Sequence, residues 1–210
     1  TSPEAFNYIP DFGRWLGAQD SRPGYSYLLR LLRVLQWQKC RAGEAPGPWL
    51  LKSPHHLHYL DVVLECFPDA RIVLTHRDPL QTMPSYASMI TALNHMGSDE
   101  IDPVAVGAYC LERFAASMER ATTIRDRFPA RFLDVAYRDC VHQPLAVLHA
   151  LYASVDVPFT AATEAAATQW LEENRREKRA AHQYAAADYG YSEEALTQCF
   201  AAYRKRFLGA

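Results

Sequence analysis

The sequence has few cysteines and no arrangement of them that indicates cross-linking. Its five cysteines, at positions 40, 66, 110, 140 and 199, are an odd set without a Cys-x-x-Cys pair. A disulfide framework needs an even, closely spaced set, so we expect reduced, buried thiols in a cytoplasmic protein. Long apolar runs are also lacking, since none approaches the ~18 residues of a membrane-spanning helix, and no signal peptide opens the chain. We therefore expect a soluble protein.

The sequence also lacks a strong charge of either sign. Its formal net charge is -2 over 210 residues, of which 22% are charged and 49% hydrophobic. This balance gives no general attraction to nucleic acid or to a membrane, so neither partner is expected and any anion site must be local. The length suffices for one core. We expect a single domain over 1–210, with a helical lead-in over 1–48, an α/β core over 49–156 and C-terminal helices over 157–210.

Glycine-rich phosphate loops are absent. None of the nine glycines belongs to a Gly-x4-Gly-Lys-Ser/Thr motif. The tripeptide His76-Arg77-Asp78 resembles the start of a protein-kinase catalytic loop. That loop needs Asn five residues after the Asp, where Met83 stands, and no Asp-Phe-Gly follows. The kinase interpretation is therefore discarded.

What the sequence does contain is a local pattern that occurs twice. In each copy a short apolar run leads to a cation, a capping residue and a proline: Trp49 to Leu51 before Lys52-Ser53-Pro54, and Ile72 to Leu74 before Arg77-Asp78-Pro79. Ser or Asp can cap the free N–H groups of a first helical turn, and proline is well tolerated at the next position. Both copies predict a strand, a tight turn and a helix.

Between the two copies lies an amphipathic segment with apolar residues at helical spacing, Leu57, Leu60, Val63, Leu64 and Phe67. A strand, a helix and a second strand connected in this way are expected to place the strands parallel, through a right-handed crossover. Both strand-to-helix turns then open on one edge of the sheet, where ligands bind in open α/β folds and helix N-termini attract anions. We expect a phosphate or sulfate pocket at that edge, lined by Lys52, His55, His56, His76, Arg77 and Ser85.

The same stretch resembles the sulfotransferases that use 3'-phosphoadenosine-5'-phosphosulfate (PAPS) as sulfuryl donor. It is similar to their bacterial-type branch in its Lys-Ser-Pro-x-His at 52–56, its Phe-Pro-Asp-Ala-Arg at 67–71 and its His-Arg-Asp-Pro at 76–79. The resemblance covers about residues 25–207. It implies a P-loop-NTPase-like α/β fold, with a parallel sheet covered by helices. It also implies transfer of a sulfuryl group from PAPS to a hydroxyl or amine of a small-molecule acceptor, without a metal.

Roles for individual residues follow. In the family an Arg at a strand end and a Ser eight residues later hold the donor's 3'-phosphate, and Arg77 and Ser85 have this spacing. Lys52, a compact cation at a predicted strand end, is expected to meet the leaving phosphate. His55 and His56 are candidates for the general base, because the dipole of a first helical turn keeps an imidazole neutral. His56 is preferred because it matches the family's histidine.

Later segments add a third strand and further helices. Residues 131–137 predict the strand, and the family places the tyrosine at its end, here Tyr137, near the adenine of the donor; a half-buried core tyrosine is the alternative. Pro84 predicts a kink near Ser85, or is simply tolerated in a short helix. Further helices are predicted over about 23–41, from the cap at Asp102-Pro103 to about Phe128, over about 144–155, and from Ser192 to about Phe207. An alanine-rich helix within 158–179 ends in cations that are either dipole partners or a second contact to the 3'-phosphate: Arg175, Arg176, Lys178 and Arg179.

The sequence departs from the family in one respect. Relatives carry a Gly-x-Pro-[Arg/Lys]-Ser-Gly-Thr loop that wraps the 5'-phosphosulfate, and nothing here matches it. Residues 1–22 have no periodic pattern, so we expect a fragment whose beginning lies upstream. Three alternatives stay open: a phosphotransferase on a P-loop-like sheet, a non-catalytic remnant that binds adenosine 3',5'-bisphosphate, and a zinc site at His55, His56 and His58. The acceptor and the oligomeric state are not specified by the sequence.

Overall fold

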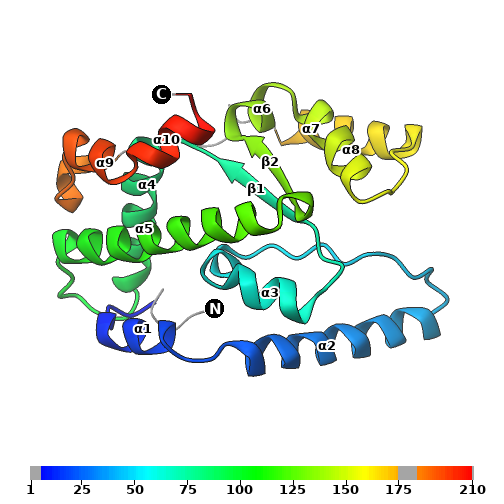
Figure 1. Ribbon diagram of the computed structural model, residues 1–210, viewed down its shortest axis with the longest axis horizontal. Helices are drawn as coiled ribbons and strands as arrows, with labels where there is room; N and C mark the ends of the chain where they lie inside the picture. The colour runs from blue at the N-terminus through cyan, green and yellow to red at the C-terminus, as the bar shows by residue number, and fades with distance from the viewer. Residues whose placement is uncertain (1–5, 175–183, 210) are drawn as a thin grey trace.

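The centre of the molecule is a pair of parallel strands. The computed structural model describes residues 6–174 and 184–209. Strands β1 (Ile72–His76) and β2 (Phe132–Ala136) pair in parallel, with Ile72 opposite Phe132 and His76 opposite Ala136. The chain between them forms helices α4 (Pro79–Asn94) and α5 (Pro103–Arg127), as Figure 1 shows. The α/β class with a parallel sheet is confirmed, and these strands are the ones predicted at 72–74 and 131–137.

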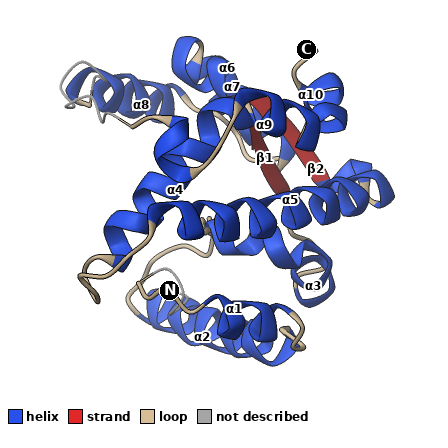
Figure 2. Ribbon diagram, turned by 90° about the vertical axis from the view of Figure 1, so that its left-hand side faces the viewer, coloured by secondary structure: helices blue, strands red, loops and turns tan. Residues whose placement is uncertain are grey.

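Helices α4 and α5 begin at the predicted caps. The Asp78 carboxylate accepts a hydrogen bond from the N–H of Leu80 at 3.1 Å, and the Asp102 carboxylate accepts one from Val104 at 2.9 Å. Helix α5 crosses the molecule and packs against α4 and other helices (Figures 1 and 2). The shared core of α4 and α5 contains Met83 and Val106, both fully buried. This core holds α4 in place directly after the end of β1.

The N-terminal part is helical and packs beneath α5. Helices α1 (Pro10–Gly17) and α2 (Arg22–Arg41) are followed by an extended segment, the 3-10 helix η2 (Pro54–Tyr59) and helix α3 (Leu60–Cys66). Helix α2 packs on η2 and α3 through a cluster that includes Tyr25, Tyr59 and Val63. Helix α3 packs in turn on α5 through Leu60 and Ala121. The predicted helix over 23–41 is confirmed.

The strand predicted at Trp49 to Leu51 does not form. Residues 44–53 have no regular structure, and Leu50 is 86% exposed. A strand needs a partner for its backbone N–H and C=O groups, and within the described residues β1 pairs only with β2. The expected parallel pair carrying Lys52 and Arg77 is therefore wrong. The parallel neighbour of β1 is the later strand, β2.

The C-terminal part consists of short helices on both sides of the sheet's end. In chain order they are η3 (Pro129–Arg131), α6 (Tyr137–His142), α7 (Pro144–Ser154), α8 (Ala161–Glu173), η5 (Ala186–Tyr189), α9 (Glu193–Cys199) and α10 (Ala201–Phe207). The final helix predicted from Ser192 is broken at Phe200, whose buried ring packs into the α4–α5 core. The cations Arg175, Arg176, Lys178 and Arg179 lie outside the described residues.

The structure also bears on the cysteines and on the length of the apolar helices. All five cysteines are free thiols, but Cys40 and Cys199 are exposed, so the expectation that all are buried is wrong. Within the described ranges, no helix combines the length and the apolar character needed to cross a membrane.

Candidate functional site

A cavity of about 620 Å³ lies along α4, beside the turn that follows β1. Arg77 lines it from the turn and Ser85 from the second turn of α4, so the structure brings these two predicted residues to one cavity. The rest of the lining comes from α4 and the residues after it, and is mostly apolar beyond its first member: Thr82, Tyr86, Met89, Ala92, Leu93 and Met96. The cavity thus has a cationic, hydroxyl-bearing end and an apolar end.

The guanidinium group of Arg77 is supported by an aromatic ring. Its Cζ lies 4.6 Å from the ring centroid of Tyr137, and its Nε donates to Oε1 of Gln81 at 3.4 Å. The strand register explains the contact, because Arg77 and Tyr137 directly follow the paired residues His76 and Ala136. A cation held against an aromatic face keeps its N–H groups free to meet an anion in the plane of the guanidinium. Tyr137 therefore belongs to the same site as Arg77 and Ser85.

The turn that carries Arg77 is tied to the C-terminal helix. Arg204 on α10 forms an ion pair with Asp78, with Nε 3.2 Å from Oδ1 and Nη2 3.2 Å from Oδ2. Asp78 therefore caps α4 and anchors α10 at the same time. Sequence reasoning missed Arg204, for which the only signal is its place in the basic run at 204–206, 126 residues beyond its partner.

His76 was expected to line the ligand edge but is only 5% exposed. Its Nε2 lies 2.9 Å from Asp134 Oδ1 and its Nδ1 lies 2.9 Å from the Tyr203 hydroxyl. Its ring stacks on Phe207, with centroids 4.2 Å apart. Successive residues at the end of a strand point to opposite faces, so His76 turns inward where Arg77 faces the cavity. The expectation for His76 is wrong, and its role is to join β1 to β2 and α10.

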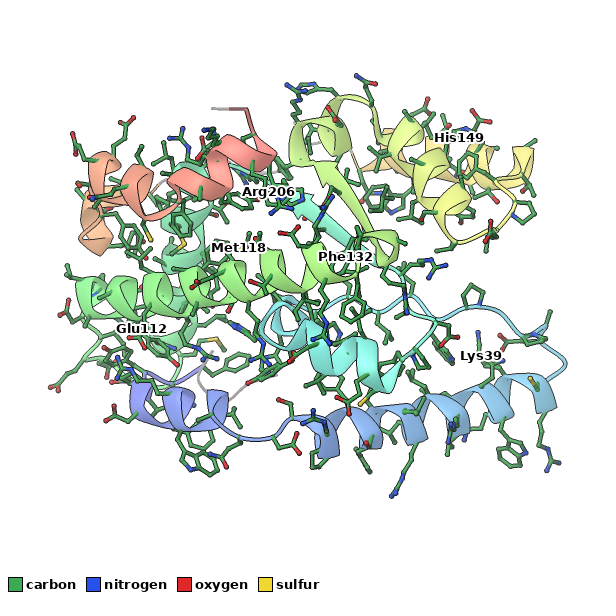
Figure 3. The ribbon with its side chains drawn as sticks, in the orientation of Figure 1. Lys39, Glu112, Met118, Phe132, His149 and Arg206 are labelled. Atoms are coloured by element: carbon green, nitrogen blue, oxygen red, sulfur yellow. The ribbon has the colours of Figure 1, made fainter. Side chains whose placement is uncertain are left out.

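Asp134 completes this buried network from β2. Besides His76 it pairs with Arg125 of α5, whose Nη2 lies 2.6 Å from Oδ2. Burial alone would raise the pKa of Asp134, but hydrogen bonds from Arg125 and His76 outweigh it, and the pKa lies below its usual value. An ion pair between Asp126 and Arg206, which is labelled in Figure 3, links α5 to α10 directly. The two strands, α5 and α10 are thus held together through His76, the residue next to Arg77.

His56, the preferred base, is held by a residue distant in the sequence. The Tyr25 hydroxyl on α2 lies 3.0 Å from His56 Nδ1. Burial lowers the pKa of His56, so its imidazole is neutral at pH 7. If Nδ1–H donates to the Tyr25 oxygen, Nε2 keeps a lone pair that can accept a proton. Sequence reasoning did not find this contact, because nothing in either local pattern relates α2 to η2.

The other histidines of η2 have different partners. His58 Nδ1 contacts the Ser117 hydroxyl on α5, and burial, followed by the charge of Arg113, lowers the pKa of His58 to about 4. His56 and His58 therefore engage helices on different sides of η2. Among the described residues there is no group of three or more His, Cys, Asp or Glu side chains placed to hold a metal ion.

Lys52 precedes η2 on the extended segment and is exposed. The next residue is the predicted cap: Ser53 Oγ accepts a hydrogen bond from the N–H of His55 at 3.2 Å. Within the part of the chain that the structure describes, the lining of the cavity includes neither Lys52 nor His56. The structure thus brings together Arg77, Ser85 and Tyr137, whereas Lys52 and His56 do not line this cavity.

The site therefore combines a cation at the end of a parallel strand, a hydroxyl on the following helix and an aromatic support, at the edge where ligands bind in open α/β folds. A family model described as "Sulfotransferase family" matches residues 2–161. This chain belongs to the sulfotransferase family.

Solved structures and curated proteins agree with this assignment. Sulfotransferase STF9 from Mycobacterium avium superposes with a TM-score of 0.86 and 30% identity over 97% of this chain and 52% of its own. Sulfotransferase STF1 from Mycobacterium tuberculosis H37Rv gives a TM-score of 0.79 with 28% identity, over 95% of this chain and 50% of its own. The omega-hydroxy-beta-dihydromenaquinone-9 sulfotransferase Stf3 of Mycobacterium bovis is 28% identical over 109 residues, which are 49% of this chain and 27% of that protein. The chain spans about half the length of the solved relatives and less of the curated one.

Proposed function

We propose that this chain binds PAPS through the donor's 3'-phosphate and serves sulfuryl transfer to a small-molecule acceptor. The observation that carries the proposal is the shared cavity of Arg77 and Ser85, with Tyr137 behind the guanidinium. Arg offers two parallel N–H donors to a phosphate and the Ser hydroxyl offers a third, which suits a dianionic group. The family match favours sulfuryl over phosphoryl transfer.

The residues present fit one end of the donor. Arg77 and Ser85 can hold the 3'-phosphate, whereas no sequence in the chain matches the family's loop for the 5'-phosphosulfate. When bound, PAPS supplies an activated sulfuryl group and leaves as adenosine 3',5'-bisphosphate. No metal is part of the proposal.

Lys52 and His56 are proposed to act at the other end of the donor. The phosphosulfate is separated from the 3'-phosphate by the ribose, so these residues need not line the same cavity. Lys52 would neutralise charge that develops on the leaving phosphate. His56, neutral at pH 7 and oriented by Tyr25, would take the acceptor's proton on Nε2.

The acceptor is proposed to be the hydroxyl of an apolar small molecule. The curated relative named above is a sulfotransferase of an omega-hydroxy dihydromenaquinone. This proposal rests on that relative and not on the cavity beside Arg77, because the acceptor must meet the sulfuryl group at the end of the donor away from the 3'-phosphate. We also propose that the protein acts in the cytoplasm.

Thermal unfolding with and without nucleotide tests the donor assignment. Adenosine 3',5'-bisphosphate at ~100 times its Kd should stabilise the intact protein by about 2.7 kcal/mol and raise Tm, and ATP should not. Protection by ATP and not by the bisphosphate would support a phosphotransferase instead.

Transfer from sulfur-35-labelled PAPS tests the catalytic assignment. His56→Ala should lower turnover by ~10²–10⁴, the usual worth of a positioned base. His55→Ala is the matched control in the same turn and should lower it far less. A protein that binds the bisphosphate but transfers nothing would be the non-catalytic remnant.

A further inference from the structure

Helix α2 carries a stripe of exposed apolar side chains along its outer side. Tyr27, Leu31, Val34 and Leu35, which we call the α2 stripe, recur at helical spacing and are each at least 43% exposed. The inner side of the helix is packed, with Tyr25 in the cluster shared with η2 and α3. Figure 3 shows α2 along one edge of the molecule, with side chains that project away from it. The helix therefore has two apolar faces, of which one is covered.

The same helix is cationic throughout. It contains five cations and no acidic residue, its cations being Arg22, Arg30, Arg33, Lys39 and Arg41. Since the whole chain has a net charge of -2 and α2 contributes +5, the rest of the chain contributes -7. A strongly one-signed face on a weakly acidic protein indicates a partner of opposite charge.

Two of these cations, Arg30 and Arg41, are placed to meet such a partner beside the stripe, and Arg33 is exposed farther round the helix. Arg22 pairs with Asp20 and Glu65, and Lys39 pairs with Glu44, on the inner side of the helix. Within the described ranges, Arg30, Arg33 and Arg41 are exposed and none forms an ion pair with a carboxylate. 

The positions of these cations follow from helix geometry. At 100° per residue, Arg30 and Arg41 run along the Val34 margin of the stripe. Trp37 lies on the same margin, with its ring centroid 5.3 Å from Cζ of Arg41. The stripe is thus bordered by cations and an interfacial aromatic.

We propose that α2 lies on the surface of an anionic lipid bilayer. The α2 stripe would enter the boundary between headgroups and acyl chains, and Arg30 and Arg41 at its margin would face the lipid phosphates. Amphipathic helices that lie in a membrane surface combine an apolar face with Lys or Arg at its margin, and Tyr and Trp favour that depth. A second copy of this chain fits less well, because a two-fold contact would set one cationic helix against another.

This partner differs from the expectation drawn from net charge. The overall value of -2 hides the five cations of α2, of which, among the residues that the structure describes, Arg22 and Lys39 are paired with carboxylates and three are not. The proposal does not rest on the proposed enzymatic function, since it concerns a surface on the outer side of α2 and its test measures binding alone.

Flotation of the intact protein with lipid vesicles tests the proposal. The protein should float with vesicles of equal parts phosphatidylglycerol and phosphatidylcholine and not with phosphatidylcholine alone, and high salt should release it. Val34→Glu should lower the partition coefficient by at least about 10-fold, through lost apolar contact and added repulsion. Val104→Glu on α5 is the matched control, because Val34 and Val104 are 52% and 50% exposed. It should leave binding unchanged.

A second pair of variants isolates the charge. Replacing Arg30 and Arg41 by Gln should lower the partition coefficient about 25-fold, at about 5-fold per cation. Replacing two exposed cations elsewhere, Arg127 and Lys205, changes the net charge equally and should have far less effect.

The proposal would be overturned by any of three results, each obtained with protein that circular dichroism shows to be folded. The wild-type protein could fail to bind anionic vesicles at low salt. The α2 variants and their controls could lose binding equally. Gel filtration could reveal a dimer that Val34→Glu dissociates, with no vesicle binding, and the stripe would then join two copies of the chain.

Discussion

Asp134→Asn tests whether the network beneath the site holds the fold together. Asp134 accepts hydrogen bonds from Arg125 and from His76, and thereby joins α5 to both strands. The substitution keeps the shape of the side chain but removes its charge, which leaves the Arg125 guanidinium without its counter-ion. The side chains of Asp134 and Arg125 are 26% and 27% exposed, so this pair is neither a surface pair nor fully buried.

The magnitude follows from that burial. Removing one partner of a fully buried pair costs about 3–5 kcal/mol, and exposed pairs are worth about 0–1 kcal/mol. We therefore expect Asp134→Asn to lower the free energy of unfolding by about 2–3 kcal/mol, which lowers Tm by about 4–12 °C in a chain of this size. Urea unfolding at pH 7 measures the loss. Asp139→Asn, at an exposed pair with Arg138, is the control and should cost less than ~0.5 kcal/mol.

The difference in stability between wild type and Asp134→Asn should depend on pH in a defined direction. The pKa of Asp134 is lowered on folding from a reference of 3.8, so its stabilising effect is present above that value and is lost as pH falls through the lower folded pKa. Wild type and Asp134→Asn should therefore differ by a constant amount above about pH 5 and converge below 3.8. Equal stabilities at pH 7, or a difference that persists in acid, would refute the reasoning.

Three other changes have defined outcomes. The pKa of His58 is about 4 in the folded protein against a reference of 6.5, so the free energy of unfolding should fall by up to ~1.4 kcal/mol per pH unit as pH falls between those values. In urea titrations His58→Gln should reduce the slope of stability against pH. An unchanged slope would exclude His58 as its source. Tyr25→Phe should lower turnover about 10-fold with little change in KM, because His56 loses the bond that fixes its tautomer, and a changed KM alone would contradict this. Gly107→Ala places a Cβ 2.2 Å from the backbone oxygen of Tyr189 and should lower the free energy of unfolding by about 1–3 kcal/mol. The control Gly24→Ala, which has nothing within 4 Å, should be neutral or stabilising by up to ~1 kcal/mol. Equal Tm shifts would show that the close contact at Gly107 relaxes freely.

Helix starts were predicted correctly, because each depends on a capping residue and a proline that are neighbours in the sequence. Asp78-Pro79, Asp102-Pro103 and Ser53-Pro54 each start a helix with the expected cap. The eight-residue spacing of Arg77 and Ser85 placed both on one cavity, because a strand end and the first turns of the next helix have little freedom.

The features that were predicted wrongly or missed depend on contacts with residues far away in the sequence. An apolar run such as Trp49 to Leu51 forms a strand only if another strand supplies its hydrogen bonds, and no described segment does so. The inward turn of His76 is set by Asp134 and Tyr203, which lie 58 and 127 residues away. Tyr25 meets His56 through the packing of α2 on η2, which no motif encodes. Side-chain direction was therefore harder to predict than element type.

The central claim is that Arg77 and Ser85 together hold the 3'-phosphate of the donor. Isothermal titration of the intact protein with adenosine 3',5'-bisphosphate and with adenosine 5'-monophosphate isolates the contribution of that one group. In the wild type we expect the bisphosphate to bind more tightly than the monophosphate by about 1.5–3 kcal/mol. The same difference is expected in the control variant Arg138→Ala, because Arg138 is an exposed cation one residue beyond Tyr137. In Arg77→Ala most of that advantage should vanish, and in Ser85→Ala part of it. An advantage that survives Arg77→Ala undiminished would place the 3'-phosphate elsewhere and contradict the account.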